Sequence, residues 1–199
     1  MSGPNMTTNT MLDAIHGFFN HPGFRSAFVK ARVPLGILVA GAVIWFAQPR
    51  WFWAGFAVSM FGEFIQLWSF ASLNKNVDLA CNGPYALVRN PMYLGRYFII
   101  LGALMLLGHP WLIGIYTVLY YFYMVNRVKR EERRLRPALG QPYEAYCARV
   151  HRFLPGAPYQ GNPVIYWKSE LLRQNNGWAN LVGTLVFWAA AGIWLLGIR

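Results

Sequence analysis

The sequence has few charged residues, few acids and almost no cysteine. Only 13% of its 199 residues are charged and 7 are acidic, whereas 56% are hydrophobic. This composition excludes an ordinary soluble domain, and the length leaves no room for several domains. The two cysteines, Cys81 and Cys147, have no CxxC spacing, and the four histidines are dispersed, so we predict neither a disulfide nor a metal site.

Long apolar blocks are what the sequence has instead. A helix needs roughly 20 residues to cross about 30 Å of hydrocarbon. Five blocks approach or reach this length: 33–47, 51–73, 92–107, 111–125 and 178–198. Only Gly108, His109 and Pro110 separate the third block from the fourth, which predicts a tight helical hairpin. We therefore expect an all-α integral membrane protein with about five transmembrane helices.

The net charge of +11 is concentrated on one side of the predicted membrane. Ten of the 18 basic residues lie between Arg127 and Arg173, which points to membrane topology and not to nucleic-acid binding. The positive-inside rule places the N-terminus, the 74–91 loop and the 127–177 segment in the cytosol. A bacterial inner membrane and a eukaryotic endomembrane fit this topology equally. The expected organisation is a cytosolic or interfacial segment (1–32), a transmembrane core (33–154), an interfacial loop (155–177) and a C-terminal transmembrane helix (178–199).

One acid, Glu63, lies inside the second apolar block. Ionisable residues within a membrane are costly and usually face the bundle interior. Glu63 and Gln66 are three residues apart and share one helical face. Two interpretations have equal weight: a buried carboxylate satisfied by Arg96 or a tyrosine hydroxyl, or part of a functional site.

The fourth block carries a polar stripe that continues beyond the membrane. Tyr120, Tyr123, Arg127 and Glu131 are spaced by three or four residues and therefore lie on one helical face. Such a stripe can present tyrosines to a lipid tail and ions to a soluble ligand. Alternatively, Arg127 and Glu131 form only an exposed ion pair, although Arg preceding Glu is the less favourable order. Pro137 is expected to end this helix or nearly so.

The loop between the second and third blocks contains Gly-Pro and Asn-Pro steps, both typical of turns. Pro91 suits the first position of a helix, where the positive end of the dipole favours a carboxylate. Arg89 and two tyrosines, Tyr85 and Tyr93, lie beside it in the sequence. This pattern predicts a pocket for a ligand with a carboxylate and an aromatic or sugar group. A plain re-entry turn with an anchoring arginine would look much the same.

Several motifs, taken together, resemble the isoprenylcysteine carboxyl methyltransferase family of integral membrane enzymes. These are Gly83-Pro84-Tyr85, Arg89-Asn90-Pro91-Met92-Tyr93 with Gly95, the pair Glu131-Glu132, and Leu139-Gly140 followed by Tyr143 and Tyr146. The resemblance covers roughly residues 55–155. The motifs are specific as a set and weak singly.

The resemblance implies an enzyme that binds S-adenosylmethionine at the cytosolic ends of its helices and takes a lipid-like acceptor from the bilayer. It implies that the cofactor contacts Val77, Asp78, Leu79, Ala80, Tyr85, Arg89, Asn90, Pro91, Met92, Tyr93, Glu131 and Glu132. It also places Arg127 near the acceptor. The histidine usual in this family is Asn90 here, and an amide cannot change its charge near neutral pH. A positional role at Asn90 survives this change, whereas a titrating role does not.

Methyl transfer from a sulfonium is a direct displacement, so the protein mainly aligns donor and acceptor and excludes water. A carboxylate acceptor is already the nucleophile and needs no general base. We therefore predict Arg127 as an orienting cation for an anionic acceptor and Glu131 as a hydrogen-bond acceptor for a polar or cationic part of the cofactor. Tyr120 and Tyr123 are expected to contact the acceptor.

Other functions remain open from the sequence alone. Within enzymes, the alternatives are a methyltransferase acting on the amine of a phospholipid and a membrane reductase that uses a nicotinamide dinucleotide. From another class, the chain could be a non-catalytic membrane scaffold. The sequence carries no prediction of oligomeric state.

Overall fold

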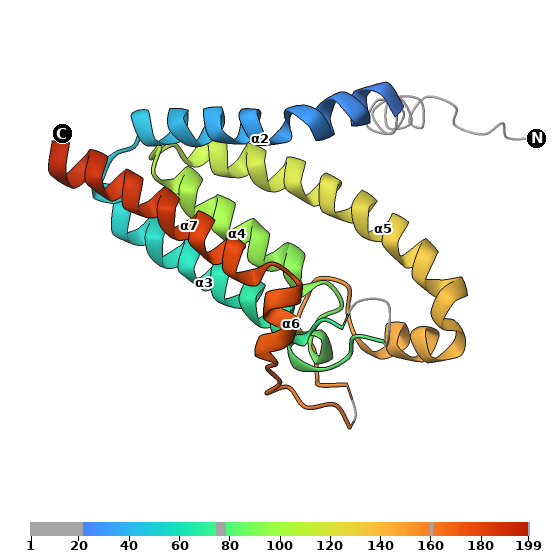
Figure 1. Cartoon of the computed structure of the whole chain (residues 1–199). Coiled ribbons are helices and arrows are strands. Elements are labelled where there is room, and N and C mark those ends of the chain that lie inside the picture. Colours follow the sequence, from blue (N-terminus) through green and yellow to red (C-terminus); the bar gives the residue numbers. More distant parts are fainter. Residues whose placement is uncertain (1–21, 75–78, 160, 199) are drawn as a thin grey trace, which may run out of the picture. The chain divides into compact units, whose positions relative to one another are not determined.

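A computed structural model describes residues 22–74, 79–159 and 161–198, and none of these lies in a β-strand. The all-α prediction is thus confirmed for the described residues. The helices are α2 (Pro22–Trp45), α3 (Phe52–Ser72), α4 (Pro91–Met105), α5 (Pro110–Arg149), α6 (Ser169–Gln174) and α7 (Gly177–Gly192), with shorter 3₁₀ or π segments at Pro49–Trp51, Gly83–Ala86 and Ile193–Ile198 (Figure 1). The chain divides into two compact units, residues 1–42 and 43–199, and the helices from α3 onward all belong to the second.

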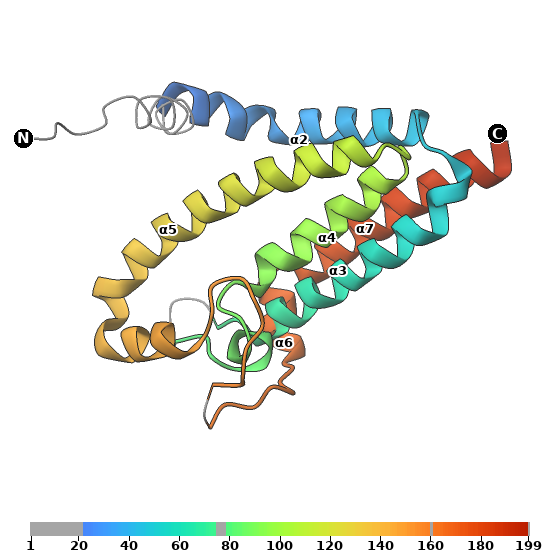
Figure 2. The same cartoon turned by 180° about the vertical axis from the view of Figure 1, so that it is seen from behind.

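Glycines bring α3 and α4 into direct backbone contact, and the two helices lie side by side in both views (Figures 1 and 2). A Cβ atom on Gly62 would lie 2.6 Å from the carbonyl oxygen of Gly95, and one on Gly55 would lie 2.5 Å from that of Gly102. Real Cβ atoms do not approach oxygen so closely. The absence of side chains at these positions is therefore what allows the two helices to pack.

The buried carboxylate of Glu63 joins α3 to α7. Glu63 is only 2% exposed. Its two oxygens accept hydrogen bonds from Asn180 Nδ2 at 2.8 and 2.9 Å, and Oε2 accepts another from Thr184 Oγ1 at 2.8 Å. The expectation that Arg96 or a tyrosine satisfies it is wrong, because Asn180 and Thr184 do so, and Arg96 lies over the ring of Tyr93. The hydrogen bonds of Glu63 thus connect α3 to α7.

Replacing Asn180 with Leu is expected to destabilise the protein by about 1–3 kcal/mol, because a buried carboxylate then loses two of its three hydrogen bonds. The midpoint of thermal unfolding in detergent measures the loss. In the double variant Glu63→Leu/Asn180→Leu the buried carboxylate is gone as well, and only the half-buried hydroxyl of Thr184 loses its partner, so part of the stability should return. A single variant as stable as the wild type would show that these bonds contribute nothing.

The C-terminal end of α3 is capped by a segment distant in sequence. Asn175 Nδ2 donates to the carbonyls of Phe70 and Leu73, at 2.9 and 2.7 Å, and the N–H of Lys168 donates to the carbonyl of Ala71. The last carbonyls of a helix have no partner within it, so these bonds satisfy groups that would otherwise be exposed or unpaired. The capping residues Lys168 and Asn175 flank a short helix, α6, which lies within the predicted interfacial loop 155–177 and was not predicted from the sequence.

One helix is by itself long and apolar enough to cross a membrane, namely α7 with its continuation to Gly197. It matches the predicted fifth block. Residues 33–45 and 49–72 meet the same criterion only when they are counted together across the break between them, and α4 is apolar but shorter. Among the described residues the structure therefore supports a candidate membrane span and not the full set of five.

The predicted turn between the third and fourth blocks is present, since α4 ends at Met105 and α5 begins at Pro110. The two helices do not stay together, however. α5 diverges from α4 along its length in both views, while α4 remains against α3 (Figures 1 and 2). The tight connection is confirmed, but the helices pack as a hairpin only near the turn.

Pro137 lies inside α5, and the helix is broken three residues later, close to the predicted end. Two helical pieces, which together run to Arg149, meet at a kink at Gly140, where φ is 59° and ψ is −141°. This conformation is essentially restricted to glycine. An ion pair between Arg136 Nη1 and Glu144 Oε1, at 2.8 Å, spans the kink. The shorter piece after the kink brings Tyr143 and Tyr146 back toward the candidate site.

An irregular segment after α5 runs along the turn before α4. The backbone N–H groups of Gly156 and Tyr159 donate to the carbonyls of Leu87 and Ala86, each at 2.9 Å, and that of Gly83 donates to the carbonyl of Pro163. These bonds hold the 83–89 turn against residues 151–163. The turn therefore has a fixed position relative to the end of α5.

Candidate functional site

The candidate site begins at the turn that leads into α4. Gly83 has a φ of 64°, which favours glycine, and the 3₁₀ segment Gly83–Ala86 follows. Asn90 is the N-cap residue of α4, and Pro91, which lacks an N–H, is its first residue. The side chain of Asn90 does not cap the helix but donates from Nδ2 to the carbonyl of Arg152 at 3.1 Å. Asn90 therefore has a positional role here.

Tyr93, Arg127 and Glu131 form one connected group. Glu131 Oε1 accepts a hydrogen bond from Tyr93 Oη at 2.8 Å and another from Arg127 Nε at 3.0 Å. A hydrogen bond with Tyr93 is the largest influence that raises the pKa of Arg127. The arginine and the glutamate keep 45% and 38% of their side-chain surface exposed. The predicted ion pair is thus present, and it is linked to α4 and still accessible to a ligand.

The hydroxyl of Tyr85 is buried and has no hydrogen-bond partner among the described residues. Burial raises its pKa, and electrostatic interactions with Glu131 and Tyr93 raise it further. The backbone carbonyl of Tyr85 accepts a hydrogen bond from Tyr146 Oη at 2.7 Å. A buried polar atom without a partner costs free energy, so the Tyr85 hydroxyl is a candidate for ligand contact.

Glu132 is the centre of a second group of side chains. Glu132 is 6% exposed and accepts hydrogen bonds from Arg152 Nε at 3.0 Å, Arg152 Nη2 at 2.6 Å and Arg89 Nη1 at 3.0 Å. Arg89 Nη1 also donates to Cys147 Sγ at 2.9 Å, and Arg89 Nε is buried with no partner among the described residues. Glu132 therefore has both oxygens occupied, whereas Arg89 keeps one unused donor.

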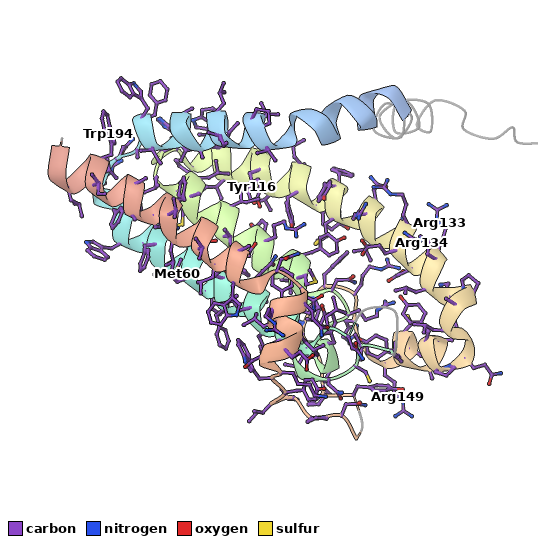
Figure 3. The ribbon with its side chains drawn as sticks, in the orientation of Figure 1. Met60, Tyr116, Arg133, Arg134, Arg149 and Trp194 are labelled. Carbon is purple, nitrogen blue, oxygen red and sulfur yellow. The ribbon has the colours of Figure 1, made fainter. Side chains whose placement is uncertain are left out.

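Aromatic side chains in the first half of α5 connect it to α4. Tyr120 Oη donates to the carbonyl of Tyr93 at 2.7 Å, and Tyr116 Oη, labelled in Figure 3, donates to the carbonyl of Tyr97 at 3.2 Å. The ring centroids of Tyr120 and Tyr123 are 5.9 Å apart. The predicted acceptor residues Tyr120 and Tyr123 thus lie next to the Tyr93 group.

Other predicted site residues are placed by their packing and not by hydrogen bonds to the glutamates. Met92 packs against the cluster of Phe70, Ala71 and Leu172, away from the glutamates. Leu79 packs against the cluster that contains Tyr143 and Tyr146, and Ala80 is half-buried. The structure does not bring the Met92 side chain to the other predicted residues. Val77 and Asp78 lie outside the described residues.

Three contributors to the site were not predicted as site residues. They are Arg152, Cys147 and Tyr146. Tyr146 had a signal, since it belongs to the tyrosine pair after Gly140. Arg152 and Cys147 had none, because their partners are 20 or more residues away and no local pattern connects them.

A recess of about 370 Å³ opens on the face of α5 next to Glu132. It is lined by Lys129, Glu132, Arg133 and Arg136. Arg133 and its neighbour Arg134 are labelled in Figure 3. Since Arg89 and Arg152 already pair with the only acid in this lining, the recess is basic.

Comparison with known proteins identifies the family. A family model described as Phospholipid methyltransferase matches residues 35–141, more than half of the chain. The chain is similar to Protein-S-isoprenylcysteine O-methyltransferase of Schizosaccharomyces pombe, with 33% identity over 85 residues that cover 43% of this chain and 36% of that protein. It is also similar to Probable protein-S-isoprenylcysteine O-methyltransferase of Oryza sativa subsp. indica, with 32% identity over 77 residues covering 39% and 40%.

The matched regions span well under half the length of these relatives. No solved structure is significantly similar to the chain. The family match covers α3, α4 and the part of α5 that carries both glutamates, which are the elements that build the candidate site. The chain therefore belongs to the phospholipid methyltransferase family.

Proposed function

We propose that the chain is an S-adenosylmethionine-dependent methyltransferase that acts on a lipid-like acceptor in the membrane, with a carboxylate as the favoured acceptor. The family supports methyl transfer, and the named relatives are O-methyltransferases of isoprenylcysteine proteins. The observation that carries the proposal is that two buried polar atoms of the predicted cofactor residues, Tyr85 Oη and Arg89 Nε, have no partner among the described residues, while Arg89 is paired with Glu132.

These residues fit the chemistry of the cofactor. The methionine part of S-adenosylmethionine carries a carboxylate and an ammonium group. Arg89 supplies a cation with an unused N–H for the carboxylate, and Glu131 supplies an accessible carboxylate for the ammonium. The hydroxyl of Tyr85 can donate to or accept from a further polar atom. Glu132, with its oxygens occupied, holds Arg89 in place.

When bound, the cofactor supplies a methyl group on a positively charged sulfur. The task of the chain is then to align the acceptor with it and to exclude water. Tyr93 and Arg127 fix the carboxylate of Glu131 through two hydrogen bonds, so that Glu131 is oriented before a ligand arrives. Arg127 donates to Glu131 from Nε and has a hydrogen bond with Tyr93, and the remaining N–H groups of its guanidinium can contact the acceptor.

Tyr120 and Tyr123 are placed to contact an acceptor that enters from the bilayer, because they lie on α5 between its apolar start and Arg127. An anionic acceptor suits Arg127.

A second candidate, the amine of a phospholipid, is favoured by one observation. Arg127 and Glu131 form an accessible pair of opposite charges, which would suit a headgroup with a phosphate and an amine.

The membrane topology proposed for this enzyme places the N-terminus and the site in the cytosol. The basic residues of α5 beyond Arg127 support it. The segments proposed are 1–32 (cytosolic or interfacial), 33–154 (core), 155–177 (interfacial) and 178–199 (transmembrane). The helix starting at Gly177, with its candidate span, fits the last of these.

Calorimetric titration of the purified protein in detergent with S-adenosylmethionine tests the proposal. We expect saturable binding by the wild type and affinity at least about tenfold lower for Glu131→Ala, since a hydrogen bond to a charged group is lost. Glu144→Ala is the matched control, because it removes the acid of an exposed ion pair on the same helix. No binding to the wild type at millimolar cofactor would contradict the proposal.

The acceptor class is read from the methylated products. Cells expressing the wild type or Glu131→Ala are labelled with a radioactive methyl donor precursor, and their lipids are separated. A carboxyl methyl ester releases its label on treatment with base, whereas a methylated amine keeps it. Base-labile label that depends on Glu131 would support the carboxylate, and base-stable label in a phospholipid would favour the second candidate.

A further inference from the structure

Arg152 lies outside the residues predicted for the site, yet it makes the closest contact with Glu132. It follows α5 in the irregular segment, and its guanidinium contacts both carboxylate oxygens, Nη2 to Oε2 at 2.6 Å and Nε to Oε1 at 3.0 Å. Such a bidentate pair is strong and has a fixed orientation. Arg89 reaches the same carboxylate with only one nitrogen, Nη1, which it also shares with Cys147.

The charges of this cluster do not cancel. One carboxylate lies between two guanidiniums, so the three side chains carry a net charge of about +1 at neutral pH. The hydrogen bond with Glu132 raises the pKa of Arg152, consistent with a pairing in which Arg152 is the main partner. Arg89 is the more buried of the two arginines, with 12% of its side chain exposed against 34% for Arg152. The excess positive charge is therefore left on the buried arginine with the unused Nε donor.

We infer that Arg152 is a positioning residue that neutralises Glu132, so that Arg89 keeps its positive charge for the carboxylate of the bound cofactor. This inference rests on the proposed function. If Arg152 were absent, Glu132 would pair with Arg89 alone, and the attraction of Arg89 for a ligand carboxylate would be largely cancelled.

The main chain around Arg152 supports the same role. The carbonyl of Arg152 accepts from Asn90 Nδ2 at 3.1 Å, and the carbonyl of His151 accepts from the N–H of Arg89 at 2.9 Å. The carbonyls of residues 151 and 152 thus fix the position of the turn that carries Arg89, while the side chain of Arg152 pairs with Glu132. The side chain of Arg152 can be changed without removing either of these backbone bonds.

The test compares two ligands that differ only in the carboxylate, S-adenosylmethionine and decarboxylated S-adenosylmethionine. Their dissociation constants are measured calorimetrically for the full-length wild type and for Arg152→Gln. We expect Arg152→Gln to weaken S-adenosylmethionine binding by roughly tenfold or more and to leave the decarboxylated ligand nearly unaffected. Arg134→Gln is the control, because it removes one exposed positive charge from the opposite side of α5 to Glu132.

A double variant, Arg152→Gln/Glu132→Gln, separates neutralisation from a general structural effect. With no carboxylate left to cancel Arg89, the preference for S-adenosylmethionine over its decarboxylated form should return. This measurement also carries the test if the single variant does not fold. Equal weakening of both ligands by Arg152→Gln, or a double variant without the preference, would overturn the inference. A wild type that binds neither ligand would instead remove the proposed function.

Discussion

Replacing Glu132 with Ala is expected to destabilise the protein by about 3–5 kcal/mol, the usual cost of removing one partner from a buried ion pair. The carboxylate is nearly inaccessible and accepts three hydrogen bonds from Arg89 and Arg152. Without it, two guanidiniums are left close together with no anion between them. Repulsion and lost hydrogen bonding then act in the same direction.

Unfolding by sodium dodecyl sulfate in mixed micelles measures this loss, with helicity followed by circular dichroism. Glu144→Ala removes an acid from an ion pair that is about half exposed, and its effect should stay within about 1 kcal/mol. A similar stability for the two variants would mean that the Glu132 cluster contributes no more than an exposed pair.

Replacing Gly102 with Leu is expected to cost at least about 3 kcal/mol, at the upper end of overpacking effects. A Cβ atom there would collide with the carbonyl of Gly55 and with both the backbone N and the Oγ of Ser59. Most of these atoms belong to the backbone, so a rotamer change cannot relieve the contact. The hydrogen bond from Ser59 Oγ to the carbonyl of Ile99, 2.8 Å long, would also be lost as the helices separate.

Gly183→Leu provides the control for Gly102→Leu. Gly183 lies in α7 and is exposed, and a Cβ atom added to it would meet no other atom of the described residues within 4 Å. The same chemical change should therefore leave stability nearly unaltered. Size-exclusion profiles and thermal midpoints of the two detergent-solubilised variants provide the measurement. Normal folding of Gly102→Leu would show that α3 and α4 can separate without cost.

Apolar blocks and helical spacing predicted the helices whose formation depends on neighbouring residues. The last apolar block matched a helix with a candidate span, and the stripe from Tyr120 to Glu131 lies on one continuous helix. The first piece of that helix ends at Gly140, three residues after the predicted Pro137. A proline removes one backbone donor, which a helix can tolerate, whereas the positive φ at Gly140 forces the chain to turn. The sequence alone did not show whether the proline or the glycine would break the helix.

The candidate site was predicted where its members share a turn or a helix face. Tyr93, Arg127 and Glu131 were found in this way, and hydrogen bonds join them in the structure. The partners of Glu63 and Glu132 were missed because they are distant in sequence. Asn180 is 117 residues from Glu63, and no periodicity links such positions. Met92 was included through its motif, but its side chain packs against Phe70, Ala71 and Leu172.

The capping of α3 by residues near the end of the chain bears on how the protein is assembled. Asn175, Asn180 and Thr184 satisfy polar groups of α3 that are synthesised more than 100 residues earlier. Until α7 has been synthesised, the carboxylate of Glu63 has none of these partners, and an unpaired buried carboxylate is costly. The packing of α7 against α3 is therefore the step that satisfies this carboxylate. A chain interrupted before α7 would leave it unpaired on α3.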